Sequence, residues 1–452
     1  MGATTAAADL TMILASRAAA LGYDDLPPGA CELARQCALD YVGVGLAGSS
    51  DQLVALVFNE MAEAGGTPQA SVLCREMRLP ALSAALVNGA AAHALDYDDV
   101  NMAMPGHPSV AILPGLLALA ELEGSSGREV ITAFVAGYET ACRIGAALRP
   151  GHYDLGFHST GTVGAFGAAA ACARLLGFDA ERTAMALGIA GTQAAGLKSQ
   201  FGTMCKPFHA GKASQNGLLA ARLAARGFTS RADIVECVQG FALTHGPDFS
   251  VEAARADPEG GLHLFGNLFK YHAACYLTHA PIECARRLRE EHRLTPDAVA
   301  GITLRLDSSC ARVCNIPAPT DGLQSKFSLR QTVAMALAGI DTASLCAYSA
   351  KNACDPGLIE LRQRVKLDWQ DSWPQTLSEL ELELSDGRRV AARHDAGIPA
   401  GDIAGQGARL VAKFDALVEP VLGPPRTSEL RQMIAALDDV ADIGGLARLA
   451  AV

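Results

Sequence analysis

The first part of the chain carries apolar residues at helical spacing. From residue 6 to about residue 122 they recur three and four positions apart, and the pattern is broken at residues 22–29 and 48–51, where glycine, proline and polar residues gather. This spacing is typical of helices that bury one face. The clearest helices are predicted at residues 110–122, 127–148, 184–197 and 212–226. The N-terminal part is therefore predicted to be helical, with one short strand at residues 71–74.

A different pattern follows a glycine-rich joint at residues 258–266. Residues 299–307 and 377–385 alternate between apolar and polar positions, which predicts half-buried strands, and Asp386-Gly387 turns the second of them into another strand at 388–392. Helices are predicted beside these strands at residues 282–291 and 331–338. After a second joint, at residues 397–401, the helical pattern returns and runs from residue 407 to the end.

These patterns predict a mainly α protein with a large all-helical domain and a smaller α+β domain. We expect the C-terminal tail to return to the first domain, so the helical domain comprises residues 1–266 together with 400–452. Residues 267–399 form the smaller domain. Because glycine-rich joints flank it, we expect this domain to act as a lid.

Composition narrows the class of protein. A chain of 452 residues is too long for one ordinary core. Half of its residues are hydrophobic but only 5% are aromatic, which favours helices packed closely through small side chains. The net charge of −11 argues against nucleic acid or an acidic membrane as a partner. Thirteen cysteines without regular spacing indicate reduced thiols, and neither a signal peptide nor a membrane span is evident, so we expect a soluble cytoplasmic protein.

The densest group of reactive side chains lies at residues 88–109. Asp96, Asp98 and Asp99 are so close in sequence that mutual repulsion should raise the pKa of at least one carboxyl. His107 is followed by proline, which disfavours the helical conformation, so we expect this imidazole on an extended turn facing outward. A helix that ends in carboxylates and an imidazole can supply proton donors and acceptors. The alternative is a capped helix end with a solvated acidic loop.

A second group lies at residues 152–162 and contains His152, Tyr153 and His158. His158 comes directly before Ser159 and Thr160, either of which can cap the next helix. The dipole at a helix N-terminus disfavours an imidazolium, so His158 is predicted to be neutral and able to act as a base. A structural role is equally open. The glycines that follow do not form a dinucleotide fingerprint, since no strand precedes them.

A third group lies at residues 202–214. Lys206, which precedes a proline, stands near His209 and Lys212 at the start of a predicted helix. Two ammonium groups beside helix-start amides can bind a carboxylate. The Gly-Lys-Ala-Ser end is not a phosphate-binding loop, because that motif requires glycine at position 206. An exposed basic turn is the alternative to a carboxylate pocket.

Together these motifs resemble the MmgE/PrpD family over essentially the whole chain. The resemblance rests on Asn88-Gly-Ala-Ala-Ala-His-Ala-Leu-Asp-Tyr-Asp-Asp, Gly106-His-Pro-Ser, Gly156-Phe-His-Ser-Thr-Gly-Thr, Lys206-Pro-Phe-His-Ala-Gly, Tyr276-Leu-Thr-His and Lys326-Phe-Ser. It implies a large helical domain with a smaller α+β lid, a homodimer, and no need for an organic cofactor or a metal.

The resemblance also implies which residues form the site. Five residues are expected to be catalytic and to line one pocket between the domains: Asp96, His107, His158, Lys206 and His279. Four more are expected to bind substrate: Tyr153, His209, Lys212 and Lys326. In this scheme Lys206 neutralises a substrate carboxylate, His107 or His158 moves a proton, and His279 or His158 serves on the opposite face. Asp96 would orient an imidazole, as the carboxylate of a triad does.

Family members that this chain resembles include 2-methylcitrate dehydratase, iminodisuccinate epimerase and cis-aconitate decarboxylase. The implied substrate is a small di- or tricarboxylate, and the implied reaction begins at a carbon next to a carboxylate. Val100 stands where a decarboxylase-like member is expected to carry a hydroxyl residue, so the first expectation is a dehydratase. The alternatives are an epimerase, a decarboxylase and a catalytically silent carboxylate-binding relative. A metal-dependent hydrolase holding an ion with His93, Asp96 and Asp99 is a further alternative.

Overall fold

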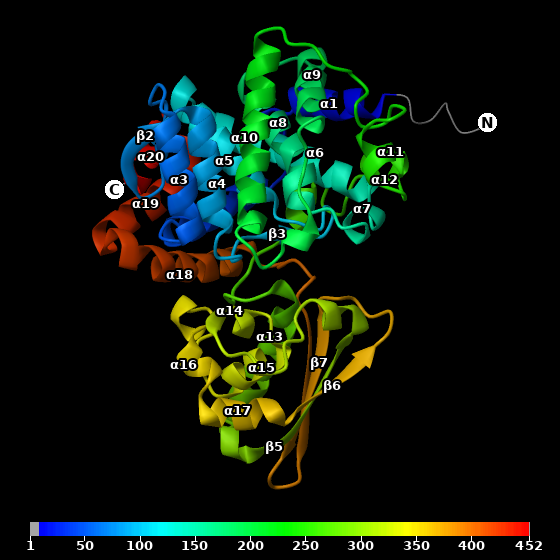
Figure 1. The fold of residues 1–452 in the computed structure, drawn as a ribbon, viewed down its shortest axis with the longest axis vertical. Helices are drawn as coiled ribbons and strands as arrows, with labels where there is room; N and C mark the ends of the chain where they lie inside the picture. Colours follow the sequence, from blue (N-terminus) through cyan, green and yellow to red (C-terminus); the bar gives the residue numbers. More distant parts are fainter. Residues whose placement is uncertain (1–8, 452) are drawn as a thin grey trace, which may run out of the picture. The chain divides into compact units, whose positions relative to one another are not determined.

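The computed structural model describes residues 9–451 (Figure 1). Within it the chain forms two compact units: residues 9–269 with 400–451, and residues 270–399. The prediction of a mainly α fold is confirmed. The lid role of the second unit stays a prediction.

The first unit is built almost entirely from helices. Its long helices are α1 Leu10–Ala20, α2 Ala30–Gly48, α3 Gln52–Ala64, α4 Ala81–His93, α5 Pro108–Glu123, α6 Gly127–Ala147, α8 Ser159–Leu175, α9 Ala180–Gly191 and α10 Cys205–Ala225. The short helices are α7 Gly151–Asp154, α11 Phe241–His245 and α12 Val251–Arg255. Two strand pairs complete this part: β1 Ala70–Val72 with β2 Arg75–Leu79, and β3 Val100–Asn101 with β4 Asn267–Leu268.

Small residues let the central helices α4, α5, α6, α8 and α10 approach one another closely. A side chain at Gly137 of α6 would place its Cβ 2.4 Å from the carbonyl oxygen of Gly167 in α8. A side chain at Gly211 of α10 would lie 2.2 Å from the carbonyl oxygen of Leu86 in α4. Both distances are far below van der Waals contact, so these positions require glycine. This packing explains why the chain needs few aromatic residues.

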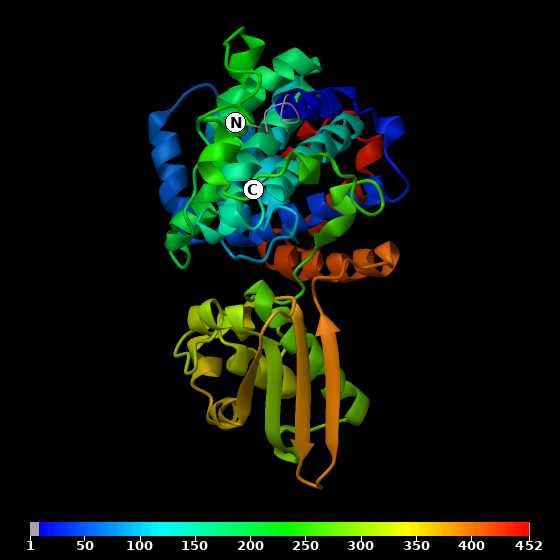
Figure 2. The same ribbon diagram turned by 90° about the vertical axis from the view of Figure 1, so that its right-hand side faces the viewer.

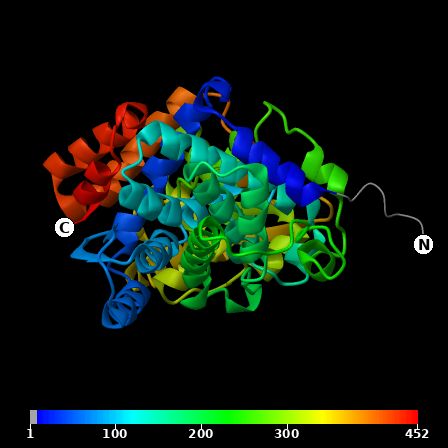
Figure 3. The same ribbon diagram turned by 90° about the horizontal axis from the view of Figure 1, so that it is seen from above.

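The C-terminal tail packs on the first unit as three helices, α18 Ile403–Leu422, α19 Pro424–Ala435 and α20 Gly444–Ala450, which run from orange to red in Figure 3. Helix α18 lies on α2, where the Lys413 ammonium is 2.6 Å from the Asp40 carboxylate and Gln406 donates to Gln36 over 2.8 Å. The tail is helical, as the pattern predicts, and it is divided into separate helices. Gly423 has a φ of 76°, a conformation in which the helix cannot continue.

Two predicted helix boundaries in the first unit differ from the structure. Helix α10 begins at Cys205 rather than at Lys212, because Pro207 falls in its first turn, where a missing N–H costs no helical hydrogen bond. Helix α9 ends at Gly191 rather than at Leu197, and a single 3₁₀ turn, Lys198–Gln200, follows. Lys206 therefore lies inside a helix and not on the loop before one.

The second unit holds a four-stranded sheet in the order β6-β5-β7-β8 (Figure 2). Its strands are β5 Val299–Asp307, β6 Val365–Gln370, β7 Leu377–Leu384 and β8 Arg389–Asp395. Its helices are α13 His279–His292, α14 Gly322–Lys326, α15 Leu329–Leu337, α16 Ala350–Ala353 and α17 Pro356–Gln363. Helix α13 packs against β7 and β8 and against α15. The inner sides of β5 and β7 are buried through Leu304, which pairs with Leu380.

Within residues 9–451 no single helix is long and apolar enough to cross a membrane. Only α2 and α3 pass that test together, and they meet at an angle of 89°. Most residues of α2 are buried inside the first unit.

Candidate active site

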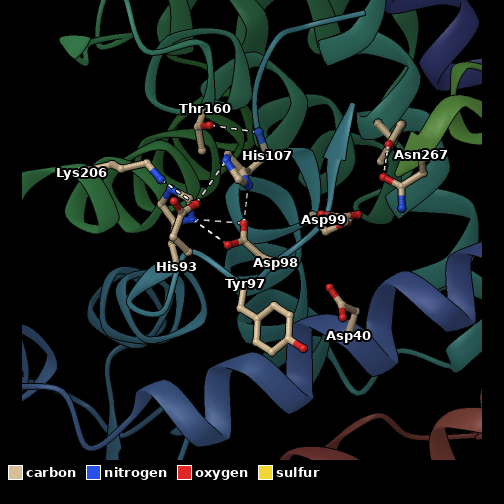
Figure 4. A network of polar contacts seen from close by, with 12 residues as sticks. Asp40, His93, Tyr97, Asp98, Asp99, His107, Thr160, Lys206 and Asn267 are labelled. Atoms are coloured by element: carbon tan, nitrogen blue, oxygen red, sulfur yellow. Dashed lines mark hydrogen bonds and ion pairs between the residues drawn. The ribbon is translucent and has the colours of Figure 1, made fainter. Parts of the chain in front are cut away.

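The turn after α4 directs its three carboxylates to different partners, and Figure 4 shows Asp98 and Asp99 pointing apart. Asp96 has a φ of 52°, a left-handed conformation that aspartate tolerates, and its Oδ1 lies 2.6 Å from the Lys206 ammonium. Asp98 and Asp99 follow and are almost fully buried. The alternative of a solvated acidic loop is therefore wrong.

Asp98 bridges two imidazoles. Its Oδ1 lies 2.9 Å from Nδ1 of His93, and its Oδ2 lies 2.9 Å from Nδ1 of His107. Burial alone would favour the neutral acid, but His107 and His93 hold the pKa of Asp98 well below its usual range. The carboxylate is therefore ionised; it accepts a hydrogen bond from Nδ1 of His93, while Nδ1 of His107 lies at ion-pair distance from it.

His107 is the N-cap residue of α5, and Pro108 is the first residue of that helix. Its φ of −117° and ψ of 90° are non-helical, as the following proline predicts, and its backbone N–H donates to Thr160 Oγ1 over 3.0 Å. The ring does not face solvent as expected, since the residue is only 8% exposed. Its Nε2 lies 3.7 Å from Asp96 Oδ1, so the ring stands between the two carboxylates.

His158 is the N-cap residue of α8, and its ring joins the same group. Its Nδ1 is 3.0 Å from Nδ1 of His209 in α10, and it stacks on His93 with ring centroids 5.9 Å apart. Burial, followed by the neighbours His93 and Lys206, holds the pKa of His158 well below its usual range. The ring is neutral, as predicted, although burial and not the helix dipole is the main cause.

Lys206 supplies the positive charge of the group. It is the second residue of α10, and its ammonium lies beside Asp96 and 5.5 Å from the centre of the Phe201 ring. An ammonium has three donors, so a carboxylate ligand can share it with Asp96. The structure thus brings together four expected site residues, Asp96, His107, His158 and Lys206, with His209 alongside.

Two expected substrate-binding residues make other contacts. Lys212 is six positions after Lys206 on α10, about 120° around the helix, and its ammonium lies 2.6 Å from Gln215 Oε1. Tyr153 packs under the Lys198 ammonium, which is 3.5 Å from its ring centre and donates to its carbonyl oxygen.

His279 and Lys326 belong to the second unit. His279 is the first residue of α13, is 3% exposed and lies edge-on to His272 at 5.0 Å. Burial lowers the pKa of His279 well below its usual range. The Lys326 ammonium lies 5.8 Å from the Tyr348 ring centre. Their part in the site stays a prediction.

The sequence interpretation assigned no proton-transfer role to His93 or Asp98, and it gave the imidazole-orienting role to Asp96. In the structure it is Asp98, and not Asp96, that makes the short contact with His107. Asp99 faces away, where Ser109 Oγ donates to its Oδ2 over 2.6 Å, and burial with nearby Asp40 raises its pKa to about 7. The signal available in the sequence was His93 five residues before Asp98, at the end of a helix.

A metal ion has a partial fit to this group. Donor atoms of His93, Asp96, Asp98 and His107 lie within 4.8 Å of one another, whereas Asp99, named in the metal alternative, points elsewhere. The Lys206 ammonium already neutralises Asp96, and Asp98 is shared by two imidazoles. A divalent ion would have to displace that ammonium, so the arrangement fits proton transfer better than metal binding.

Comparisons with known proteins show which family the sequence matches. The chain matches the MmgE/PrpD N-terminal domain over residues 12–253 and the MmgE/PrpD C-terminal domain over residues 272–439. It is 26% identical to a cis-aconitate decarboxylase of Aspergillus terreus, over 95% of this chain and 93% of that protein. It is 27% identical to the mouse cis-aconitate decarboxylase, over 95% and 91%, and 30% identical to the human one, over 71% and 69%. The chain therefore belongs to the MmgE/PrpD family.

Proposed function

We propose that this protein is a lyase that moves a proton at a carbon next to a carboxylate of a small di- or tricarboxylate, without an organic cofactor. One observation carries the proposal: an ionised, buried Asp98 holds His107, whose other nitrogen faces the Asp96–Lys206 ion pair. An imidazole backed by a carboxylate can both take and give a proton near neutral pH. An ammonium beside it suits the carboxylate of a substrate.

The roles follow from these positions. Lys206 binds the substrate carboxylate and stabilises the negative charge that builds on it when the neighbouring carbon ionises. His107 exchanges the proton through Nε2, while Asp98 stabilises the imidazolium. His158, neutral and beside His93, is the second group able to take a proton. His279 completes the predicted set.

Decarboxylation of a cis-aconitate-like tricarboxylate is the first candidate reaction, because the relatives described above are named cis-aconitate decarboxylases. In such a reaction a carboxylate leaves as carbon dioxide and its bonding electron pair shifts into the carbon skeleton. A general acid then protonates the carbon on which that pair ends. His107, whose Nδ1 lies beside Asp98, can supply that proton through Nε2.

Dehydration of a 2-methylcitrate-like hydroxy acid is the second candidate, and Val100 favours it. Val100 is buried in β3 opposite Leu268 and offers no hydroxyl where a decarboxylase-like member is expected to carry one. In a dehydration the base removes a proton next to a carboxylate, the electron pair forms the double bond, and hydroxide leaves with a proton from the acid. The same side chains serve both reactions.

Incubation with candidate acids in heavy water tests the proposal. We expect deuterium at the carbon next to a carboxylate in the substrate or product, and we expect turnover to survive exhaustive chelation. Carbon dioxide identifies decarboxylation, an alkene formed with loss of water identifies dehydration, and inverted configuration identifies epimerisation. His107→Gln should abolish exchange. Binding of the acids without exchange or turnover would contradict the proposal and favour a silent relative.

A further inference from the structure

His93 is a buried imidazole that the proposed reaction does not require to touch substrate. It is the last residue of α4 and is 0% exposed, whereas the side chain of His107 is 11% exposed. Its ring lies 4.5 Å from that of His107, centre to centre. Its Nδ1 is within 2.9 and 3.1 Å of the two oxygens of Asp98 (Figure 4). Its Nε2 has no hydrogen-bond partner within residues 9–451.

The ionised state of Asp98 determines where the protons are. An ionised carboxylate only accepts hydrogen bonds, so Nδ1 of His93 and Nδ1 of His107 both carry hydrogen. Each ring therefore presents Nε2 as its acceptor when it is neutral. Burial lowers the pKa of His93 to about 4, so His93 donates to Asp98 as a neutral group and leaves the carboxylate its charge.

We propose that His93 is a positioning residue for the reaction: by donating from Nδ1 to Asp98, it holds that carboxylate against His107 and limits how strongly it attracts a proton on His107. A cation in this place would neutralise Asp98, and an apolar side chain would leave half of the carboxylate unpaired in the interior. A neutral donor does neither. This inference rests on the proposed function, in which His107 transfers the proton.

The effect of His93 on His107 can be measured separately from the effects of the other groups around His107. The other titratable groups near His107 come from three elements. The turn after α4 provides Asp96 and Asp98, helix α10 provides Lys206 and His209, and the start of α8 provides His158. Asp99 and Asp40 lie behind the turn. All of these remain when only His93 is changed, so a shift in the titration of His107 reports on the His93–Asp98 contact.

Three substitutions separate the two ring nitrogens. Asparagine can place an N–H where Nδ1 of His93 stands, glutamine places its amide near Nε2, and leucine provides neither. If His93 acts through Nδ1, His93→Asn should keep kcat/KM near the wild-type value. His93→Gln and His93→Leu should lower kcat/KM by about 10-fold to 100-fold, as loss of a supporting contact does. If His93→Leu does not fold, His93→Gln still carries the comparison.

The titration of His107 can be followed without substrate, by mass spectrometry of hydrogen exchange at the imidazole C2 carbon of its peptide. We expect the His107 midpoint to rise in His93→Leu and His93→Gln, because Asp98 then gives its undivided charge to His107. We expect no change in His93→Asn, nor in His263→Asn, which alters a half-buried histidine outside this group. This measurement stands even if the proposed function fails.

Two results would overturn the inference. An unshifted His107 midpoint in both His93→Gln and His93→Leu would show that His93 only fills space. A kcat/KM near the wild-type value in His93→Gln but not in His93→Asn would show that His93 acts through Nε2, as a catalytic residue. Absence of turnover in the wild type, with the expected midpoint shifts, would refute the proposed function alone.

Discussion

Asp98 and Asp99 show how much the surroundings of a single residue decide. They are adjacent in the chain and both are buried, yet two imidazoles keep Asp98 ionised while burial and Asp40 raise the pKa of Asp99 to about 7. The side chains of adjacent residues here point to opposite sides of the turn, so one serves the reactive group and the other the helix core. Charge at each site therefore depends on the partners and not on the residue type.

His107 and His158 should both be needed for turnover. We expect His107→Asn, His107→Gln, His158→Asn and His158→Gln to lower kcat by about 10² to 10⁴, the usual contribution of a general acid or base. Both rings are buried, so polar replacements are needed to keep the fold. Rates are to be compared with melting temperatures, and a loss below about tenfold at both positions would contradict the assignment.

Lys206→Met should act on substrate binding at least as strongly as on rate. The substitution removes the cation that meets a substrate carboxylate in a protein of net charge −11, and it leaves Asp96 facing the ligand. We expect a higher KM for a dicarboxylate, and weaker binding to the wild type as salt rises. Arg226→Met removes an exposed positive charge at the end of the same helix and serves as the control. Unchanged kcat and KM in Lys206→Met would place the binding site elsewhere.

At the scale of the elements, helix α18 contacts the turn that carries Asp96 and Asp98. Its Lys413 donates to the carbonyl oxygen of Tyr97 over 2.7 Å while its ammonium pairs with Asp40 of α2. The turn that carries Asp96 and Asp98 is thereby tied to two helices that are more than 300 positions apart in sequence. A C-terminal helix thus contributes to the geometry of an N-terminal motif.

Lys413→Met should destabilise the protein strongly, by about 3–5 kcal/mol, because it leaves a buried carboxylate without its counterion. The paired variant Lys413→Met with Asp40→Asn should recover part of this loss. Arg431→Gln breaks a partly exposed ion pair between α19 and Asp415 of α18, and we expect it to cost less than about 1 kcal/mol. Equal effects of Lys413→Met and Arg431→Gln in urea unfolding would contradict the role given to Lys413.

At the scale of the whole molecule, buried histidines link stability to pH. Burial lowers the pKa of seven histidines: His93, His152, His158, His209, His245, His263 and His279. Unfolding returns each ring to a pKa near 6.5, so below that pH the unfolded chain binds more protons than the folded one. Asp99 and Glu139 oppose this trend, because their raised pKa values of about 7 let the folded state keep protons.

The histidines outnumber the opposing acids, so we expect the melting temperature to rise between pH 5 and pH 6.5. Each histidine contributes up to about 1.4 kcal/mol per pH unit in this range. Scanning calorimetry at constant ionic strength measures the slope, and His263→Asn should reduce it. A flat or falling profile would show that the acids dominate. The lid role predicted for residues 267–399 and the predicted homodimer stay predictions.

The sequence alone was sufficient for the elements whose pattern is local and long. Helices α5 and α6 and strands β5 and β7 lie close to where their periodicity predicts them. His107 could be recognised because the proline after it constrains its backbone, whereas His158 is itself the N-cap residue of α8 and neither Ser159 nor Thr160 caps that helix, contrary to the sequence prediction. Strand β6 was missed although residues 365–370 alternate between apolar and polar positions, and its pairing with β5 joins segments about 60 residues apart.

Only the tertiary structure decided which groups meet. The contact of Lys206 with Asp96, the choice of Asp98 over Asp96 as the support of His107, and the stacking of His93 on His158 all join different elements. Sequence spacing cannot give these pairings, because the rotation of each helix about its axis is set by packing against its neighbours. Protonation follows from burial and from these partners, so the chemistry of the site is a property of the folded chain.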